Sequence, residues 1–255
     1  MIDVHVHILP GLDDGAADMD EALEMAELAY ESGVRRIAAT PHSNQIGRFE
    51  NFYSDNLIQV YENFCHAVKQ EKIPLRIDLG MEIFSAEDIK EGIIQNKLIG
   101  LHNSSVYLVE FPFDSDPGWM GEQMEALLEI NKIPLIAHPE RYFCVQDYPN
   151  LVYEWTRLGC YSQMNRGSIL GRFGKRVHRT SQILMEHDLV TCVASDAHSS
   201  YARTTYMADI WNYIDEYYGE DVAYRLLWEN PQRILEKKYI PVHGKNIERK
   251  RKFFW

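Results

Sequence analysis

The sequence predicts an α/β protein with a parallel, barrel-like sheet. Three observations favour this fold class: seven runs have the composition of β-strands, helical patterns fall between most of them, and no linker or repeat divides the chain. Barrels of this kind reach 255 residues as one unit. We therefore expect a single domain over residues 1–255, with a basic-aromatic tail from about residue 241.

The expected strands are short runs rich in β-branched and apolar residues. They cover residues 2–8, 35–42, 75–83, 105–112, 133–141, 160–167 and 189–198. Helices are expected where apolar residues recur on one face, as Ala22, Met25 and Ala29 do before the stop signal Gly33. They cover residues 18–33, 55–72, 120–132, 150–159 and 175–188, and two closing helices are expected within 211–238.

Composition excludes several classes of function. A net charge of −12 argues against broad electrostatic binding to nucleic acid or anionic lipid. No apolar run reaches the roughly 18 residues of a membrane span, and no secretory leader opens the sequence. The four cysteines form no CxxC pair, which is typical of reduced thiols. We expect a soluble, cytoplasmic protein without stable membrane insertion, and interpret the tail GKNIERKRKFFW as a solvated terminus in preference to a membrane or partner contact.

Ionisable residues gather at the carboxyl-terminal side of the expected strands, where the loops of an α/β barrel form the active site. They are His5, His7, Asp14, His42, Glu82, Glu110, His138, Asp196 and His198. One histidine or aspartate on a strand is usually structural. Burying nine such groups together without cations would cost many kcal/mol, so jointly they predict a metal site.

The spacing of these residues indicates which ions they would bind. His5 and His7 are two residues apart on a strand, so both imidazoles point to the same face and can reach one ion. Asp196 and His198 repeat this spacing. Mixed imidazole and carboxylate ligands suit Mn, Fe or Zn better than calcium. Nine ligands are too many for one ion and indicate two or three ions with bridging carboxylates.

A second stretch of the sequence matches the spacing of a known catalytic motif. Cys160 and Arg166 satisfy C-x5-R, the pattern of cysteine-dependent tyrosine phosphatases. The phosphate loop of those enzymes generally needs glycines and a reactive thiolate. No glycine lies between Cys160 and Arg166, and YSQMN is typical of a strand. We interpret the match as coincidental.

Several motifs, in order, resemble a known superfamily. HVHILPGLDDGA, TPH, GMEI, VEFP, AHPER, NRGS and SDAH resemble the motifs of the polymerase-and-histidinol-phosphatase (PHP) superfamily. Among these, HILPGLDDGA, HPER and NRGS are similar to the bacterial capsule-associated protein-tyrosine phosphatases of the CpsB/CapC type. The resemblance runs from Ile2 to about Leu235 and implies a distorted (β/α)7 TIM-like barrel with three divalent ions, most readily Mn, with Fe, Co or Zn as alternatives.

Carried over by position, the resemblance implies a partition of the ligands among three ions. The first ion would take His5, His7, Glu82 and Asp196, the second Glu110 and His138 with Glu82 as a bridge, and the third Asp14, His42 and His198. Such a cluster would make a locally positive pocket in an acidic protein and lower the pKa of a bound water for attack on phosphorus. Arg141, Arg166 and Arg203 lie just beyond the ligand strands and are candidates to bind the phosphoryl group.

The resemblance implies a phosphotyrosine phosphatase acting on a protein, in particular the tyrosine-rich tail of a bacterial tyrosine kinase that governs polysaccharide export. The aromatic residues Phe113, Tyr142 and Phe143 could receive the phenyl ring, or belong to the core. Two alternatives stay open: a small-molecule phosphomonoesterase similar to histidinol-phosphate phosphatase, and a metal-binding regulatory module without catalysis. A nucleic-acid partner is disfavoured by the acidic charge balance.

Overall fold

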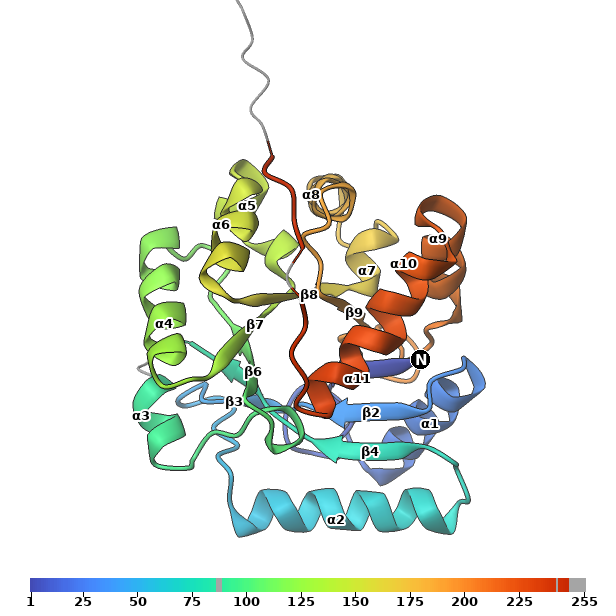
Figure 1. Cartoon of the computed structure of the whole chain (residues 1–255). Coiled ribbons are helices and arrows are strands. Elements are labelled where there is room, and N and C mark those ends of the chain that lie inside the picture. Colours follow the sequence, from blue (N-terminus) through green and yellow to red (C-terminus); the bar gives the residue numbers. More distant parts are fainter. Residues whose placement is uncertain (86–88, 242, 248–255) are drawn as a thin grey trace, which may run out of the picture.

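The computed structural model describes residues 1–85, 89–241 and 243–247 and shows an α/β fold with helices outside parallel strands (Figure 1). The strands are β1 (Ile2–Val6), β2 (Arg36–Ala39), β3 (His42–Ser43), β4 (Arg76–Leu79), β5 (Glu82–Phe84), β6 (Val106–Glu110), β7 (Ile133–Ala137), β8 (Tyr161–Asn165) and β9 (Cys192–Ala194). They pair in parallel as a three-stranded sheet, β1-β2-β4, and a six-stranded sheet, β3-β5-β6-β7-β8-β9.

The second and third expected strands are each divided in two. The first division, between β2 and β3, falls at Thr40 and Pro41, and proline has no N–H to continue a ladder. The second, between β4 and β5, falls at Gly80, where a Cβ atom would lie 2.7 Å from a methyl carbon of Leu101. Backbone bonds still cross both divisions, because Gly80 donates to Ala39 (2.9 Å) and Glu82 donates to Pro41 (3.1 Å). The two sheets are therefore hydrogen-bonded to each other at this point.

The helices surround these strands. They are α1 (Met19–Glu31), α2 (Asp55–Gln70), α3 (Ile89–Ile94), α4 (Pro117–Glu129), α5 (Phe143–Asp147), α6 (Asn150–Leu158), α7 (Arg166–Ile169), α8 (Lys175–Glu186), α9 (Ala208–Tyr218), α10 (Glu220–Tyr224) and α11 (Asn230–Leu235), with 3-10 turns η1 (Leu101–Asn103) and η2 (Pro139–Arg141). Side chains of Asp18, Ser54 and Asp116 accept hydrogen bonds from the first turns of α1, α2 and α4. Of the two closing helices expected, one is α9, and the other is a continuous helical run in which the π-helical turn η3 (Arg225–Glu229) joins α10 to α11.

Strand residues on the inner side of the sheets form a core of their own. Val4, Leu108, Leu135 and Cys192 are buried in one apolar cluster with Ile234, which belongs to α11. A larger cluster fills the layer between strands and helices. Helix α11 therefore covers one end of the strands, and the opposite end is left for loops.

Hydrogen bonds join the first strand to the segment that follows the last one. Asp196 donates its backbone N–H to His5 (3.0 Å), and His7 donates to Ala197 (2.9 Å). This pairing brings the carboxyl ends of β1 and β9 together, although they are almost 190 residues apart in the sequence.

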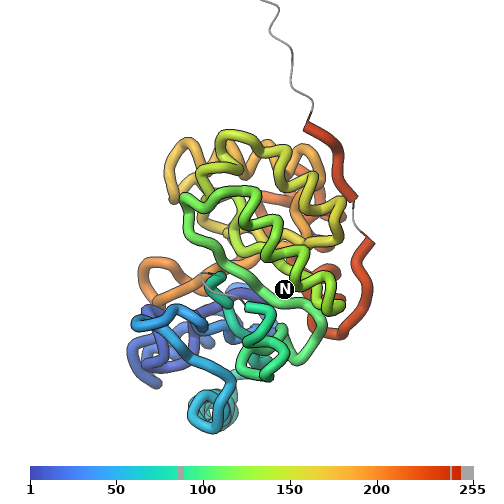
Figure 2. Tube along the Cα trace, turned by 90° about the vertical axis from the view of Figure 1, so that its left-hand side faces the viewer, coloured from blue at the N-terminus to red at the C-terminus, as the bar shows by residue number. Residues whose placement is uncertain are grey.

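The last described residues, 238–241 and 243–247, run along the outside of the body, where Figure 2 shows them in red near the end of the trace. Ile240 is buried and its N–H donates to the hydroxyl of Tyr161 (3.1 Å), while Ile247 donates to the side chain of Asn150 (2.9 Å). The basic run Arg249 to Lys252 lies outside the described residues. No helix among the described residues is long and apolar enough to cross a bilayer.

Candidate metal centre

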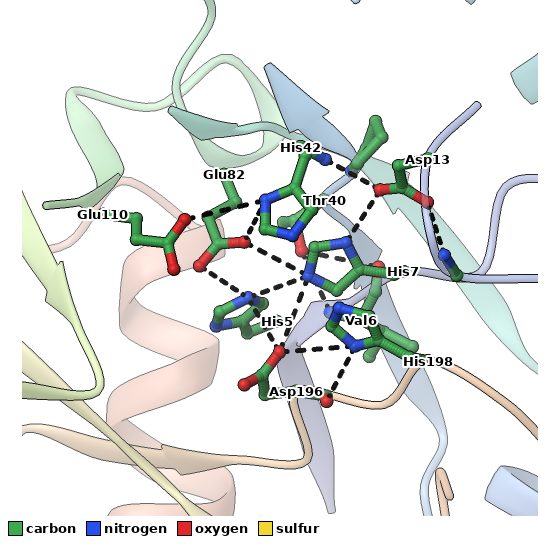
Figure 3. A network of polar contacts seen from close by, with 12 residues as sticks. His5, Val6, His7, Asp13, Thr40, His42, Glu82, Glu110, Asp196 and His198 are labelled. Atoms are coloured by element: carbon green, nitrogen blue, oxygen red, sulfur yellow. Dashed lines mark hydrogen bonds and ion pairs between the residues drawn. The ribbon is translucent and has the colours of Figure 1, made fainter. Parts of the chain in front are cut away.

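His5 of β1 and His7, which follows this strand, lie side by side at the carboxyl end of the strands (Figure 3). His5 and His7 are fully buried, and their Nε2 atoms are 3.2 Å apart. The other ring nitrogens have fixed partners: His5 Nδ1 lies 2.9 Å from Gln163 Oε1, and His7 Nδ1 lies 2.8 Å from Asp13 Oδ2. Such partners orient an imidazole and direct its free nitrogen to a metal ion. Both Nε2 atoms can therefore serve one cation.

Glu82, the first residue of β5, is the carboxylate at the middle of the histidines. Oε1 lies 3.2 Å from His5 Nε2 and 3.2 Å from His138 Nε2. Oε2 lies 3.2 Å from His7 Nε2 and 2.9 Å from His42 Nδ1. Burial opposes ionisation of Glu82, but the imidazoles outweigh it and hold its pKa well below the usual value. A carboxylate with histidines at both oxygens has the contacts of a bridging ligand.

Glu110, the last residue of β6, is a second buried carboxyl group beside Glu82. Burial, together with the negative charges of Glu82 and Asp196, raises the pKa of Glu110 well above its usual value. His138 Nε2 lies 3.5 Å from Glu110 Oε1. Two neighbouring carboxylates cannot both ionise cheaply in a buried site, so this pair favours a bound cation.

His138 and Asp196 follow β7 and β9 and have left-handed backbones, with φ of 34° and 50°. This conformation is uncommon for residues other than glycine, and strained backbones of this kind cluster at functional sites. Burial lowers the pKa of His138 to about 4, which keeps its imidazole neutral, as a metal ligand requires. The two oxygens of Asp196 face different neighbours: Oδ1 lies 3.5 Å from His5 Nε2, while Oδ2 contacts Arg203, Asn165 and Arg141.

Asp14, His42 and His198 form the outer part of the cluster. The side chain of Asp14 is 45% exposed, and its Oδ1 lies 3.4 Å from His42 Nε2 and 3.6 Å from His198 Nε2. Burial and the nearby His7 lower the pKa of His198 to about 2, so its imidazole is neutral. Asp14 also lies 3.5 Å from the guanidinium of Arg48, on the loop after β3. This carboxylate is therefore on a loop and in contact with solvent, unlike the ligands on the strands.

The donor atoms fit divalent transition-metal ions. Three groups each place their donor atoms within 4.8 Å of one another: His5, His7 and Asp196; His7, Asp14, His42 and His198; and His42, Glu82 and Glu110. His42 Nδ1 and Glu82 Oε2 are buried and lack hydrogen-bond partners among the described residues, although they are only 2.9 Å apart. A cation would satisfy both atoms, and nitrogen with carboxylate oxygen suits Mn, Fe, Co or Zn. The structure thus brings all nine predicted residues together.

A pocket of about 240 Å³ opens over this cluster. Arg141 and Arg203 line it, together with Phe113. Arg166 does not line it: its guanidinium donates two hydrogen bonds of 2.7 Å to the carboxylate of Asp209. Of the other aromatic candidates, Tyr142 is buried and accepts a hydrogen bond from the N–H of Phe111, and Phe143 is 54% exposed and outside the pocket lining.

The residues that support the candidate ligands were not predicted from the sequence. Asp13 accepts from His7 and from the backbone N–H of His42 (2.8 Å). Gln163 and Asn165 join His5 to Asp196, since Gln163 Nε2 donates to Asn165 Oδ1 (2.8 Å) and Asn165 Nδ2 donates to Asp196. A signal was present: two polar residues two apart on an apolar strand, the same spacing as His5 and His7. Arg48 of the pocket lining was also missed.

Comparisons with known proteins find a family model and relatives that match nearly the whole chain. The family model for capsular polysaccharide synthesis proteins, CpsB/CapC, matches residues 1–236. The chain is similar to the tyrosine-protein phosphatase YwqE of Bacillus subtilis, with 34% identity over 254 residues that cover 100% of this chain and 99% of YwqE. It is similar to the tyrosine-protein phosphatase CpsB of Streptococcus pneumoniae, with 30% identity over 94% of this chain and 100% of CpsB.

Solved structures share the fold. One from a study of YwqE and CpsB, described there as unique metal-dependent tyrosine phosphatases, matches with a TM-score of 0.90 at 33% identity, covering 98% of this chain and 100% of the other. A lactonase from Listeria monocytogenes matches with a TM-score of 0.60 at 14% identity over 93% of this chain and 95% of its own, which is a likeness of fold alone.

Proposed function

The chain belongs to the CpsB/CapC family of capsular polysaccharide synthesis, and we propose that it is a metal-dependent protein-tyrosine phosphatase. One observation carries this proposal: nine imidazole and carboxylate side chains converge beneath a pocket lined by three arginines, Arg48, Arg141 and Arg203. Relatives named tyrosine-protein phosphatases match over the whole length of the chain, so the activity is not inferred from a fragment.

The nine side chains would hold three divalent ions, most readily Mn, with Fe, Co or Zn as alternatives. In this proposal the first ion takes His5, His7, Glu82 and Asp196, the second Glu82, Glu110 and His138, and the third Asp14, His42 and His198. The short contacts of Glu82 with histidines at both oxygens support its role as the bridge. Bound ions would supply an activated water and neutralise phosphoryl oxygens.

The protein itself would bind and orient the phosphate. Arg141 and Arg203 both reach Oδ2 of Asp196, so their guanidinium groups lie at the edge of the cluster facing the pocket. Guanidinium groups bind phosphate oxygens as planar forks. Phe84, Phe111 and Phe113 line the same pocket and give the phenyl ring of phosphotyrosine an apolar wall. Arg166, in contact with Asp209, would act only indirectly.

The two sheets would be parts of one distorted (β/α)7 barrel in a single domain of residues 1–255. The backbone bonds that cross the divisions of the second and third strands support this arrangement, as do those between β1 and residues 196–197. We place the protein in the cytoplasm, because its four cysteines are unpaired. Its substrate there would be a phosphotyrosine protein, in particular the tail of a bacterial tyrosine kinase that controls capsule or exopolysaccharide synthesis.

The decisive experiment compares substrates and cofactors on one preparation. Purified protein is analysed for metal content and assayed on a phosphotyrosine peptide, the matched phosphoserine peptide, histidinol phosphate and nucleotides. We expect the phosphotyrosine peptide to have the highest kcat/KM, a chelator to abolish turnover, and Mn to restore it. Faster turnover of histidinol phosphate would favour the small-molecule phosphomonoesterase, and a metal-loaded protein without turnover would favour a regulatory module.

A further inference from the structure

We infer that Phe173 is a positioning residue for the substrate phosphate, because its ring holds the guanidinium groups of both Arg141 and Arg203 at the pocket. This inference rests on the proposed function, which assigns those two arginines to the phosphoryl group. Phe173 itself is outside the lining of the pocket, so it would act through the arginines and not on the substrate.

The ring of Phe173 faces both arginines. The Cζ atom of Arg141 lies 5.0 Å from the ring centroid, and that of Arg203 lies 5.9 Å from it. Arg141 also lies over the ring of Phe113, at 4.6 Å. A guanidinium plane stacks favourably on an aromatic face, and the contact restricts the rotation of a long, flexible side chain. One ring therefore restricts the side chains of both arginines at the pocket.

The ring packs on the backbone of Gly167. A Cβ atom at this position would lie 2.7 Å from Cε2 and 3.0 Å from Cζ of Phe173, closer than such atoms approach. Any side chain at position 167 would push the ring toward the arginines or out of their reach. This close approach gives a physical reason for the glycine of the NRGS motif.

The turn that carries Phe173 is held by a hydrogen bond from its Arg172 to Asp209 of α9. Gly171 and Gly174 have φ of 75° and 92° and enclose the pair Arg172 and Phe173 between α7 and α8. Arg172 donates to Oδ2 of Asp209 (3.0 Å), the same carboxylate that binds Arg166. Arg166 and Arg172 thus fix the turn through one residue of α9. Arg166 would therefore support the phosphate site indirectly, through Asp209 and the turn that carries Phe173.

Phe173 does not serve the apolar core. Among the described residues it is a member of neither buried apolar cluster, nor is it one of the partly buried apolar side chains packed against the larger one. An aromatic ring that contacts two arginines and a glycine backbone, and not the core, is placed for the arginines. Removing the ring should therefore change phosphate binding more than folding.

The test is Phe173→Leu in the full, metal-loaded protein, with Phe173→Tyr as the conservative variant and Phe143→Leu as the matched control. Phe143 is an exposed aromatic residue that makes no cation–π contact with an arginine in the described part of the chain. The measurements are the Kd of orthophosphate by calorimetry, kcat and KM on a phosphotyrosine peptide, metal content and the midpoint of thermal unfolding.

We expect Phe173→Leu to raise the Kd of orthophosphate and the KM by about fivefold to tenfold, the size of one lost cation–π contact or slightly more. Phe173→Tyr and Phe143→Leu should stay within about twofold of the parent protein, and metal content should be unchanged in all variants. In an Arg141→Ala background the effect of Phe173→Leu should shrink, because one of its two partners is gone.

Equal phosphate affinity in Phe173→Leu and the parent protein would overturn the inference, as would an undiminished effect in the Arg141→Ala background. If Phe173→Leu fails to fold, the ring is structural and the inference is also overturned, unless Gly167→Ala stays folded and weakens phosphate binding. A parent protein that binds orthophosphate through these residues but does not hydrolyse phosphotyrosine would refute the proposed function and leave the positioning role of Phe173 intact.

Discussion

Two regions of this protein have the residue spacing of a phosphatase active site, but the structure brings the important residues together in only one of them. In the candidate metal centre, nine side chains from far-apart segments converge within contact distance. In the stretch from Cys160 to Arg166, the two chemically important residues lie at opposite ends of β8, about 20 Å apart at the usual rise of a strand. Residues that surround one phosphate cannot be so distant, so the C-x5-R match carries no active site.

The environments of the two regions differ as much as their geometry. Burial raises the pKa of the Cys160 thiol from its ordinary value of 9.0 to about 12. The thiol therefore stays protonated, and unreactive, at pH values where an ordinary thiol would ionise. Arg166 is engaged by Asp209. In His5 and His7, in contrast, Gln163 and Asp13 hold the Nδ1 atoms, and the Nε2 atoms are free to bind a metal ion. Spacing in sequence therefore predicts chemistry only where the backbone turns the spaced residues toward one point.

The strongest test of the metal centre is His5→Ala. We expect kcat/KM on phosphotyrosine peptide to fall by about 10³-fold or more, because the variant loses a buried ligand and leaves Glu82 and Asp196 poorly compensated. Elemental analysis should show loss of bound metal. The control is His66→Ala, which removes an exposed histidine of α2. Similar activity in His5→Ala and His66→Ala would show that His5 is not part of a metal site that activity requires.

Asp14→Ala separates the outer part of the cluster from the strand-borne part. Asp14 is on a loop and its side chain is 45% exposed, so its removal should lower kcat/KM by about 10²-fold and leave most of the metal bound. Metal stoichiometry measured beside activity distinguishes this variant from His5→Ala. Complete loss of metal in Asp14→Ala would show that the ions bind only as a unit.

Asp13→Ala tests the support behind the ligands. Asp13 accepts from His7 and from the backbone of His42, and removing such a partner weakens metal affinity by about tenfold to 100-fold. The expected loss is therefore one that excess Mn restores. Titration of activity with Mn in the presence of a chelator measures it. A loss that saturating Mn does not repair would place Asp13 in the reaction itself.

Cys160→Ser has the smallest expected effect and tests the other region. Because the raised pKa keeps the thiol neutral between pH 7 and pH 9, its thiolate fraction is about 10³-fold below that of an ordinary thiol. We expect kcat/KM within about twofold of the parent protein and no inactivation by iodoacetamide that traces to Cys160. Cys160→Ala controls for the buried hydroxyl. Loss of activity in both variants with metal content intact would reverse the comparison.

Much of the fold follows from local sequence, because each strand has its own apolar run and each amphipathic helix its own face. The division of the third strand does not, since it depends on Leu101 approaching Gly80 from another part of the chain. The helical run from α10 to α11 likewise contains a π-helical turn, which the apolar pattern of residues 211–238 does not predict.

The candidate ligands were predictable because their types are unusual at strand ends and because a parallel sheet gathers those ends. Among the supporting residues, Asp13 was not, because it differs from an ordinary loop residue only in what it contacts, whereas the spacing of Gln163 and Asn165 on one strand was a signal. Arg166 shows the converse: its position beside the ligand strands was visible in the sequence, but its partner Asp209, 43 residues away, was not. Ligation of metal by the nine residues stays a prediction.

The divided contacts of Asp196 have a thermodynamic consequence. One oxygen faces the histidines and the other the arginines, so a cation that withdraws electron density from the first weakens the hydrogen bonds at the second. If a cation binds at the first oxygen and phosphate binds at the arginines, as proposed, the two binding steps would be coupled, and each would change the affinity for the other ligand by the same factor. Through the single carboxylate of Asp196, the protein without its cations would therefore bind phosphorylated protein more weakly than the metal-loaded protein does.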